Sequence, residues 1–241
     1  MGGLSELKLL PFEPGDGDAA ACELEIAAAM DSASALRWPL RQIGWGQRNC
    51  LQLTLKRCFD LMAAALGLLV LLPFLLVLAC IIRIDTSGPV LYRQKRVGVG
   101  GREFCLYKLR TMTTDAEKNG PCWAEPADPR VTRIGKFLRR HRLDELPQLW
   151  NVLRGDMSLV GPRPERMCFI LQFMRENPNF LLRLTMRPGI TGLAQVNGGY
   201  DLSPDEKAVL DMDYIYNFSL ARDLRIILKT PRVVLRGDGA H

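Results

Sequence analysis

The chain has 241 residues, of which 48% are hydrophobic, and a formal net charge of +6. This length suits one domain of ordinary size with appendages, and the apolar content excludes an intrinsically disordered chain. Two histidines are too few for a histidine-rich metal centre or a credible Ser-His-Asp triad, and the chain has no Walker A loop. Seven scattered cysteines without a Cys-x-x-Cys pair are typical of reduced cytosolic thiols.

The charge is distributed unevenly along the chain. Residues 1–35 carry a net charge of −6, so the remainder carries +12. A basic body suits anionic lipid, a nucleotide diphosphate or nucleic acid, and charge alone does not choose among them. Residues 1–50 are rich in alanine and glycine and lack the basic start of a signal peptide. We therefore expect a weakly ordered N-terminal extension over residues 1–50.

A run of 22 residues without a charged side chain extends from Leu61 to Ile82. At about 1.5 Å per residue, a helix of this length crosses a bilayer core of roughly 30 Å. Pro73 interrupts the run, and basic residues flank both of its ends. Positive charge at both ends suits a re-entrant helix, whose two ends lie on the same side of the membrane. Pro73 does not exclude a spanning helix, because spanning helices tolerate prolines. These features predict a membrane segment and slightly favour spanning, with re-entry left open.

Two short strands are expected next, over residues 89–92 and 104–107, joined into a hairpin around the glycines at 98–101. The charged residues between them would form a solvated edge. Residues 113–128 read as a polar loop that is a candidate lid. A helix is predicted over residues 134–138.

Four basic or potentially basic residues end that helix, Arg139-Arg140-His141-Arg142. They would either focus a positive field on the residues that follow or form a solvated basic face.

Two adjacent carboxylates follow this basic cluster. Asp144 is a candidate N-cap of a helix with Pro147 in its first turn. Asp144 and Glu145 would then lie at the positive end of a helix dipole, which favours their ionised form and attracts phosphate. A hard divalent cation would offset the repulsion between carboxylate and phosphate. An Asp-Glu pair at a helix start is nevertheless most often a simple cap.

Arg163 lies between two prolines, and its planar side chain suits bidentate binding of phosphate, although Gly-Pro-Arg-Pro alone is most often a rigid loop. A further helix is expected over residues 166–173. The C-terminal segment predicts an amphipathic basic helix from Leu220 to the residue before Pro231. Such a helix either lies in the membrane interface or packs on the core, and the pattern leaves both open.

The stretch LDELPQLWNVLRGDMSLVGPRP, residues 143–164, closely resembles the signature of the bacterial sugar transferase family, the monotopic polyprenyl-phosphate phosphoglycosyl transferases. The resemblance covers about residues 52–237. It includes KRxFD over residues 56–60, KxRTM over residues 108–112 and RPGITGLAQVNG over residues 187–198.

The resemblance implies an α+β, mostly helical fold in two parts. A re-entrant membrane helix-break-helix would occupy residues 51–85, bent at Pro73, where the family usually has Ser-Pro and this chain has Leu72. A cytosolic catalytic domain with a short β-hairpin and interfacial C-terminal helices would occupy residues 86–241. The resemblance therefore favours re-entry, and it implies the cytoplasmic face of a bacterial inner membrane.

The resemblance also implies a reaction. A sugar-1-phosphate would move from a UDP-sugar to polyprenyl (undecaprenyl) phosphate through a covalent aspartyl-phosphosugar, with release of UMP, to start polysaccharide or glycoconjugate assembly. Asp144 would be the nucleophile, and Glu145 would assist through Mg²⁺, held by the same two carboxylates, or by positioning. The substrate-binding residues would be Lys108, Arg110, Arg139, Arg163 and Arg187.

One position departs from the family pattern. Gly199 stands where the family commonly has an arginine that contacts phosphate, so either Arg187 compensates or the substrate is bound differently. The expected partners are the UDP-sugar, polyprenyl phosphate and membrane lipid, without nucleic acid, and a homodimer stays open. A non-catalytic membrane scaffold and a glycosidase are the alternatives. The scaffold does not need Asp144, Glu145 and Arg163 together, and adjacent carboxylates rarely flank a glycosidic bond at the separation required.

Overall fold

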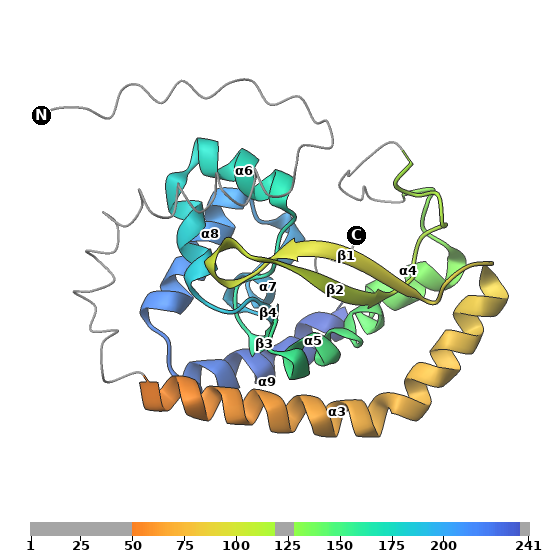
Figure 1. Cartoon of the computed structure of the whole chain (residues 1–241), viewed down its shortest axis with the longest axis horizontal. Helices are drawn as coiled ribbons and strands as arrows, with labels where there is room; N and C mark the ends of the chain where they lie inside the picture. The colour runs from red at the N-terminus through yellow and green to blue at the C-terminus, as the bar shows by residue number, and fades with distance from the viewer. Residues whose placement is uncertain (1–49, 119–127, 237–241) are drawn as a thin grey trace, which may run out of the picture.

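The computed structural model describes residues 50–118 and 128–236 (Figure 1). The helices and strands in chain order are α3 (Cys50–Asp85), β1 (Leu91–Val97), β2 (Glu103–Leu109), α4 (Arg133–Arg140), α5 (Gln148–Arg154), β3 (Ser158–Val160), α6 (Met167–Glu176), β4 (Gly189–Thr191), α7 (Leu193–Val196), α8 (Pro204–Tyr216) and α9 (Leu220–Arg236). Short 3₁₀ turns are η2 (Val99–Gly101), η3 (Leu143–Glu145), η4 (Pro178–Thr185) and η5 (Gly199–Asp201). The expectation of a mostly helical fold with a β-hairpin is confirmed. The predicted extension, apart from Cys50, lies outside the described residues.

The helix α3 runs along one side of the body and bends beyond its middle (Figure 1). Pro73 lies inside it, and the helix continues on both sides. Because proline lacks an N–H and its ring crowds the preceding turn, it is a common cause of such bends. The helix-break-helix expected over residues 51–85 is therefore one continuous, bent helix of 36 residues.

Most of the apolar surface of α3 is exposed. Only 11% of its most apolar 18-residue stretch is buried, and Met62 and Leu69 are 66% and 72% exposed. A core helix of a soluble protein would be mostly buried, and a contiguous exposed apolar surface of this size marks contact with another apolar phase. By length and composition α3 is able to cross a membrane, and these properties support membrane association.

Both ends of α3 pack against the same folded body. Near its start, Lys56 forms an ion pair with Asp223 of α9 at 2.7 Å. Asp60 accepts hydrogen bonds from Ser158 Oγ at 2.7 Å and from the backbone N–H of Leu159 at 3.1 Å. Near its end, Ile82 belongs to a buried cluster with residues of β2 and α4. The folded body is thus attached to α3 on both sides of the bend.

The hairpin pairs β1 with β2 in antiparallel register, from Leu91 opposite Leu109 to Val97 opposite Glu103. Both strands are longer than the predicted ones. In β1 the charged residues that were expected at a solvated edge are part of the strand. Exposed and half-buried positions alternate along β1, so every second side chain faces the body.

The second sheet is a short parallel pair. Ser158 of β3 lies opposite Gly189 of β4, and Val160 lies opposite Thr191. The backbone at Gly161, directly after β3, lies very close to Gly189 of β4. A β-carbon on Gly189 would lie 2.1 Å from the backbone nitrogen of Gly161. This contact fixes the start of the loop that carries Arg163.

The C-terminal helix α9 extends further than predicted. It continues through Pro231 to Arg236. Pro231 is exposed on the surface of the folded body. The helix lies beside the first half of α3 (Figure 1), where Ile226 is buried while Leu224 and Leu228 are 52% and 70% exposed.

Candidate active site

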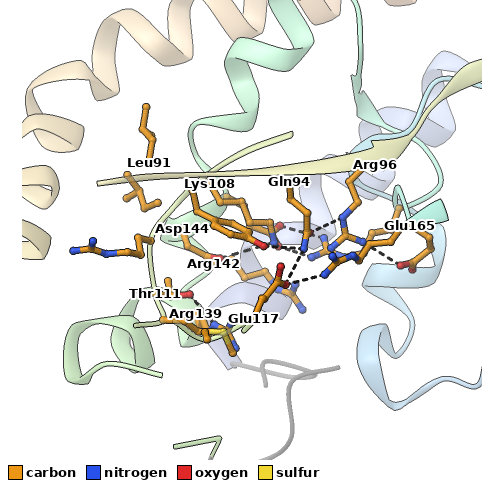
Figure 2. Close-up of a pocket in the computed structure, with 18 of the residues that line it drawn as sticks. Leu91, Gln94, Arg96, Lys108, Thr111, Glu117, Arg139, Arg142, Asp144 and Glu165 are labelled. Atoms are coloured by element: carbon orange, nitrogen blue, oxygen red, sulfur yellow. Dashed lines mark hydrogen bonds and ion pairs between the residues drawn. The ribbon is translucent and has the colours of Figure 1, made fainter. Parts of the chain in front are cut away.

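A cavity of about 410 Å³ opens between the hairpin, η3 and the loop after β3, and side chains from all three project into it (Figure 2). Its lining combines ten cationic residues with four carboxylates. The cationic residues are Arg96, Lys108, Arg110, Arg130, Arg139, Arg142, Arg163, Arg166, Arg183 and Lys207. The carboxylates are Glu117, Asp144, Glu145 and Glu165. Such a lining suits a ligand with several negative charges.

Glu145 is held by two cations that come from distant parts of the chain. Arg163 Nη2 donates to Glu145 Oε1 at 2.5 Å and Arg163 Nη1 donates to Oε2 at 3.3 Å. Lys108 Nζ, at the end of β2, donates to Glu145 Oε1 at 3.1 Å. Burial raises the pKa of Glu145, but Arg163 and Lys108 outweigh it and hold the pKa well below the ordinary value. Glu145 is therefore an ionised organising residue.

Asp144 lies beside this pair and has weaker cationic contacts. Its side chain is 9% exposed, and Lys108 Nζ lies 4.0 Å from Asp144 Oδ2. Burial raises the pKa of Asp144 above its ordinary value, with Lys108 acting in the opposite direction and Glu145 adding to the rise. A buried, poorly compensated carboxylate is more basic than an exposed one, and such groups cluster at functional sites.

The local backbone differs from the prediction. Asp144 and Glu145 form the turn η3, and the N-cap of α5 is Pro147, without a side-chain cap. Pro147 has no N–H, and the left-handed conformation of Arg142 turns the chain before the carboxylates instead. The prediction of Asp144 as an N-cap is wrong. Because α5 has only 7 residues, the positive environment comes from side chains rather than from a helix dipole.

Three of the five predicted substrate-binding residues lie together at this pair. Lys108 and Arg163 contact it directly, and Arg139 lines the cavity, with its Nε donating to Thr111 Oγ1 at 2.9 Å. Figure 2 shows Arg139 and Thr111 next to each other below Asp144.

The two other predicted residues make their polar contacts elsewhere. Arg110 is among the residues of the cavity wall, but its guanidinium donates to the carbonyls of Thr86 and Ser87 at 2.7 and 2.9 Å, which fixes the loop after α3. Arg187 is exposed and donates to the carbonyl of Gly155 at 3.3 Å, outside the cavity lining. Arg187 is therefore not placed to compensate for Gly199.

Several site residues were missed by sequence reasoning. Arg96 was assigned to a solvated edge, yet it lies in the cavity and pairs with Glu165 at 3.3 Å. Lys95, its neighbour, faces outward to Glu103. Alternation along a longer strand was the available signal, because successive side chains of a strand point to opposite faces. Arg183 had no local signal; it pairs with Asp211 at 2.7 Å and donates to the carbonyl of Arg163 at 3.0 Å.

The family model described as "Bacterial sugar transferase" matches residues 51–237, which include α3, the hairpin and every residue of the Asp144–Glu145 site. The chain belongs to this family. The resemblance noted for residues 143–164 is thereby confirmed, and the family segment begins one residue after the start of α3.

Two similar proteins have names that include their substrates. The chain is 46% identical over 190 residues to a UDP-N-acetylgalactosamine-undecaprenyl-phosphate N-acetylgalactosaminephosphotransferase of Aeromonas hydrophila. The matched region covers 78% of this chain and 45% of that protein. It is 44% identical over 191 residues to a UDP-glucose:undecaprenyl-phosphate glucose-1-phosphate transferase of Caulobacter vibrioides, covering 77% and 72% respectively. The chain thus spans less than half of the Aeromonas relative.

Proposed function

We propose that this chain transfers a sugar-1-phosphate from a UDP-sugar to polyprenyl (undecaprenyl) phosphate, releases UMP, and starts the assembly of a polysaccharide or glycoconjugate. The observation that carries the proposal is the buried pair of Asp144 and Glu145 in a cation-lined cavity, next to a long apolar helix with an exposed surface. The names of the two relatives support a sugar nucleotide as donor and undecaprenyl phosphate as acceptor.

Asp144 is the proposed nucleophile, and Glu145 is not. Both oxygens of Glu145 accept hydrogen bonds from Arg163, whereas Lys108 Nζ lies 4.0 Å from Asp144 Oδ2. A carboxylate that is less compensated retains more nucleophilic character. In the first step an oxygen of Asp144 attacks the β-phosphorus of the UDP-sugar, the bond to the bridging oxygen breaks, and UMP leaves with the electron pair.

The second step reverses the roles of nucleophile and leaving group. A phosphate oxygen of polyprenyl phosphate attacks the phosphorus of the aspartyl-phosphosugar, the bond to Asp144 breaks, and the carboxylate is regenerated as polyprenyl-diphospho-sugar leaves. Arg163, Lys108 and Arg139 would hold the phosphate oxygens in both steps, since positioning and charge compensation supply most of the catalysis of phosphoryl transfer.

The same carboxylates suit Mg²⁺. They offer hard oxygen ligands, and Mg²⁺ is commonly bound by one or two carboxylates together with substrate phosphates. The described residues contain no group of three or more acidic, histidine or cysteine side chains that would form a complete metal cage, so the diphosphate would supply further ligands. Asp144 and Glu145 would hold the ion, which neutralises charge on the diphosphate when it is bound.

The proposed location is the cytoplasmic face of a bacterial inner membrane, with α3 re-entrant in one leaflet. Lys56 and Ile82, at opposite ends of α3, are both buried against one folded body, and this supports placing both ends on the same side of the membrane. On α9, Leu224 and Leu228 are exposed next to basic residues, as expected for a helix in the interface. The cavity would then lie at the height of the lipid headgroups.

Asp144→Asn tests the proposal in purified membranes supplied with polyprenyl phosphate and a panel of UDP-sugars. We expect the wild type to release UMP from at least one UDP-sugar and to form a labelled phosphosugar adduct. The variant should lose both together. Release of UMP by the variant at a near wild-type rate would show that Asp144 is not the nucleophile.

A further inference from the structure

Arg142 has a backbone conformation that few arginines adopt. Its φ of 51° and ψ of 25° are left-handed, and no other non-glycine residue within 50–118 and 128–236 has a positive φ. Residues with a β-carbon are disfavoured in this region, and such conformations persist where the surrounding structure imposes them, often at functional sites. The Arg142 carbonyl accepts from the N–H of Glu145 at 3.3 Å. Arg142 is thus fixed directly before the two carboxylates.

The side chain of Arg142 reaches a glycine from a distant segment. A β-carbon on Gly199 would lie 3.7 Å from Arg142 Nη2, and both residues line the cavity. Gly199 has a φ of 59° and follows Gly198, whose φ is 159°. Glycine adopts positive φ angles readily, so both positions of this turn hold the residue that suits their backbone. A β-carbon at position 199 would thus be in van der Waals contact with the Arg142 guanidinium, and a longer side chain would have to pass beside it.

The charge of Arg142 adds to that of its neighbours at the carboxylate pair. Lys108 and Arg163 are bonded to Glu145, and Arg142 is a further cation that helps them to outweigh burial and keep the pKa of Glu145 low. Figure 2 shows Arg142 among the side chains around Asp144. A guanidinium in this position offers a planar set of donors to phosphate oxygens.

We propose that Arg142 is a substrate-binding residue that contacts phosphate oxygens of the sugar nucleotide, and that Gly199 is required to keep its position open. This inference rests on the proposed function and adds a residue to its site. It also accounts for the glycine where the family resemblance leads one to expect an arginine: the cation comes from the turn before Asp144. Arg187, which faces Gly155, is not required for this role.

The test uses the purified full chain in detergent micelles, with UMP release and the binding of UDP as two separate measurements. Arg142→Ala should raise KM for the UDP-sugar and Kd for UDP at least tenfold, with a smaller change in kcat, and Arg142→Lys should lie between. Arg142→Gly suits the left-handed backbone and should therefore fold well while losing the same affinity. Arg133→Ala, an exposed arginine on α4, should stay within twofold of the wild type.

A second pair of variants tests Gly199. Gly199→Arg alone should weaken UDP binding through crowding, and Arg142→Ser combined with Gly199→Arg should recover most of it by supplying the guanidinium from the other side. A folded double variant without recovery would refute the role of Gly199.

Wild-type UDP affinity in folded Arg142→Gly and Arg142→Ala would overturn the role of Arg142. If the wild type binds UDP but releases UMP from no UDP-sugar, the proposed function fails, and the difference in Kd alone decides the role of Arg142. If the wild type does not bind UDP, both proposals fail.

Discussion

Arg163 and Glu145 form a bidentate ion pair, with Nη2 to Oε1 at 2.5 Å and Nη1 to Oε2 at 3.3 Å. The two residues are 18 positions apart and belong to different turns, so the pair ties the loop after β3 to η3. Lys108 adds a third segment at 3.1 Å from the same carboxylate. Glu145 therefore joins three segments of the site, and Asp144, its neighbour in sequence, has the weaker cationic contacts.

The first prediction separates the two carboxylates by their effect on stability. Glu145→Gln should lower the free energy of unfolding by about 3 kcal/mol at neutral pH, because it removes the buried negative charge that compensates the half-buried Arg163 and Lys108. Asp144→Asn should leave it unchanged or raise it, since burial disfavours the ionised aspartate. Thermal unfolding in detergent measures both variants. Equal destabilisation by the two would contradict this division of roles.

The second prediction concerns the pH dependence of activity. In the proposed mechanism Asp144 attacks in its ionised form. Because its pKa is raised, kcat/KM should fall with decreasing pH at a higher pH than for an ordinary aspartate. Burial sets the direction of this shift, and the charge of Lys108 limits it. Lys108→Met should therefore move the acid limb to still higher pH. UMP release measured as a function of pH gives the acid side of this profile. If Lys108→Met leaves the acid side at the same pH, Lys108 is not coupled to Asp144.

The third prediction concerns lipid contact along α3. Leu69→Lys introduces a charge at a position that is 72% exposed on the apolar helix and should weaken binding to lipid vesicles about a hundredfold, given a cost of roughly 2.5 kcal/mol for lysine in the bilayer core. Val209→Lys on α8, at 67% exposure, is the matched control and should bind as the wild type does. Vesicle flotation compares them, and equal flotation would place α3 outside the lipid.

The fourth prediction concerns the topology of α3. Both ends should face the cytoplasm if the helix is re-entrant. In a variant without other cysteines, Cys50 and a cysteine introduced by Asp85→Cys should each react with a membrane-impermeant maleimide only after the cytoplasmic face is opened. Reaction at one end from the periplasmic side of intact cells would instead indicate a spanning helix.

The fifth prediction concerns the buried junction between α3 and α9. Lys56→Met should lower the free energy of unfolding by about 3 kcal/mol, because it leaves Asp223 as a buried charge without its cation. Asp223→Asn should lower the free energy of unfolding less in the Lys56→Met variant than in the wild type. A double-mutant cycle should give a coupling energy above about 1 kcal/mol. Lys95→Met removes the ion pair with Glu103, in which the lysine side chain is 71% exposed, and should lower the free energy of unfolding by less than about 1 kcal/mol. A Lys56 effect no larger than that of Lys95 would refute the junction.

Local patterns in the sequence were sufficient for several elements. The uncharged run from Leu61 to Ile82 predicted α3. Two short apolar runs on either side of the glycines at 98–101 predicted the hairpin, and the signature over residues 143–164 predicted the carboxylate pair and Arg163. These are features of near neighbours, since helix and strand periodicities report which side chains share a face within one segment. They misjudged lengths wherever a charged residue or a proline lay inside an element, as in β1 and at Pro231 of α9.

By itself, then, the sequence determined the membrane helix, the family and the identity of the two adjacent carboxylates. Only the tertiary structure decided which of the two carboxylates is held by cations, because Lys108 and Arg163 reach Glu145 through the packing of β2, η3 and the loop after β3. It likewise turned Arg110 and Arg187 toward backbone carbonyls and brought Arg142 next to Gly199. The direction of a long cationic side chain depends on partners far away in the chain, and no local periodicity encodes those partners.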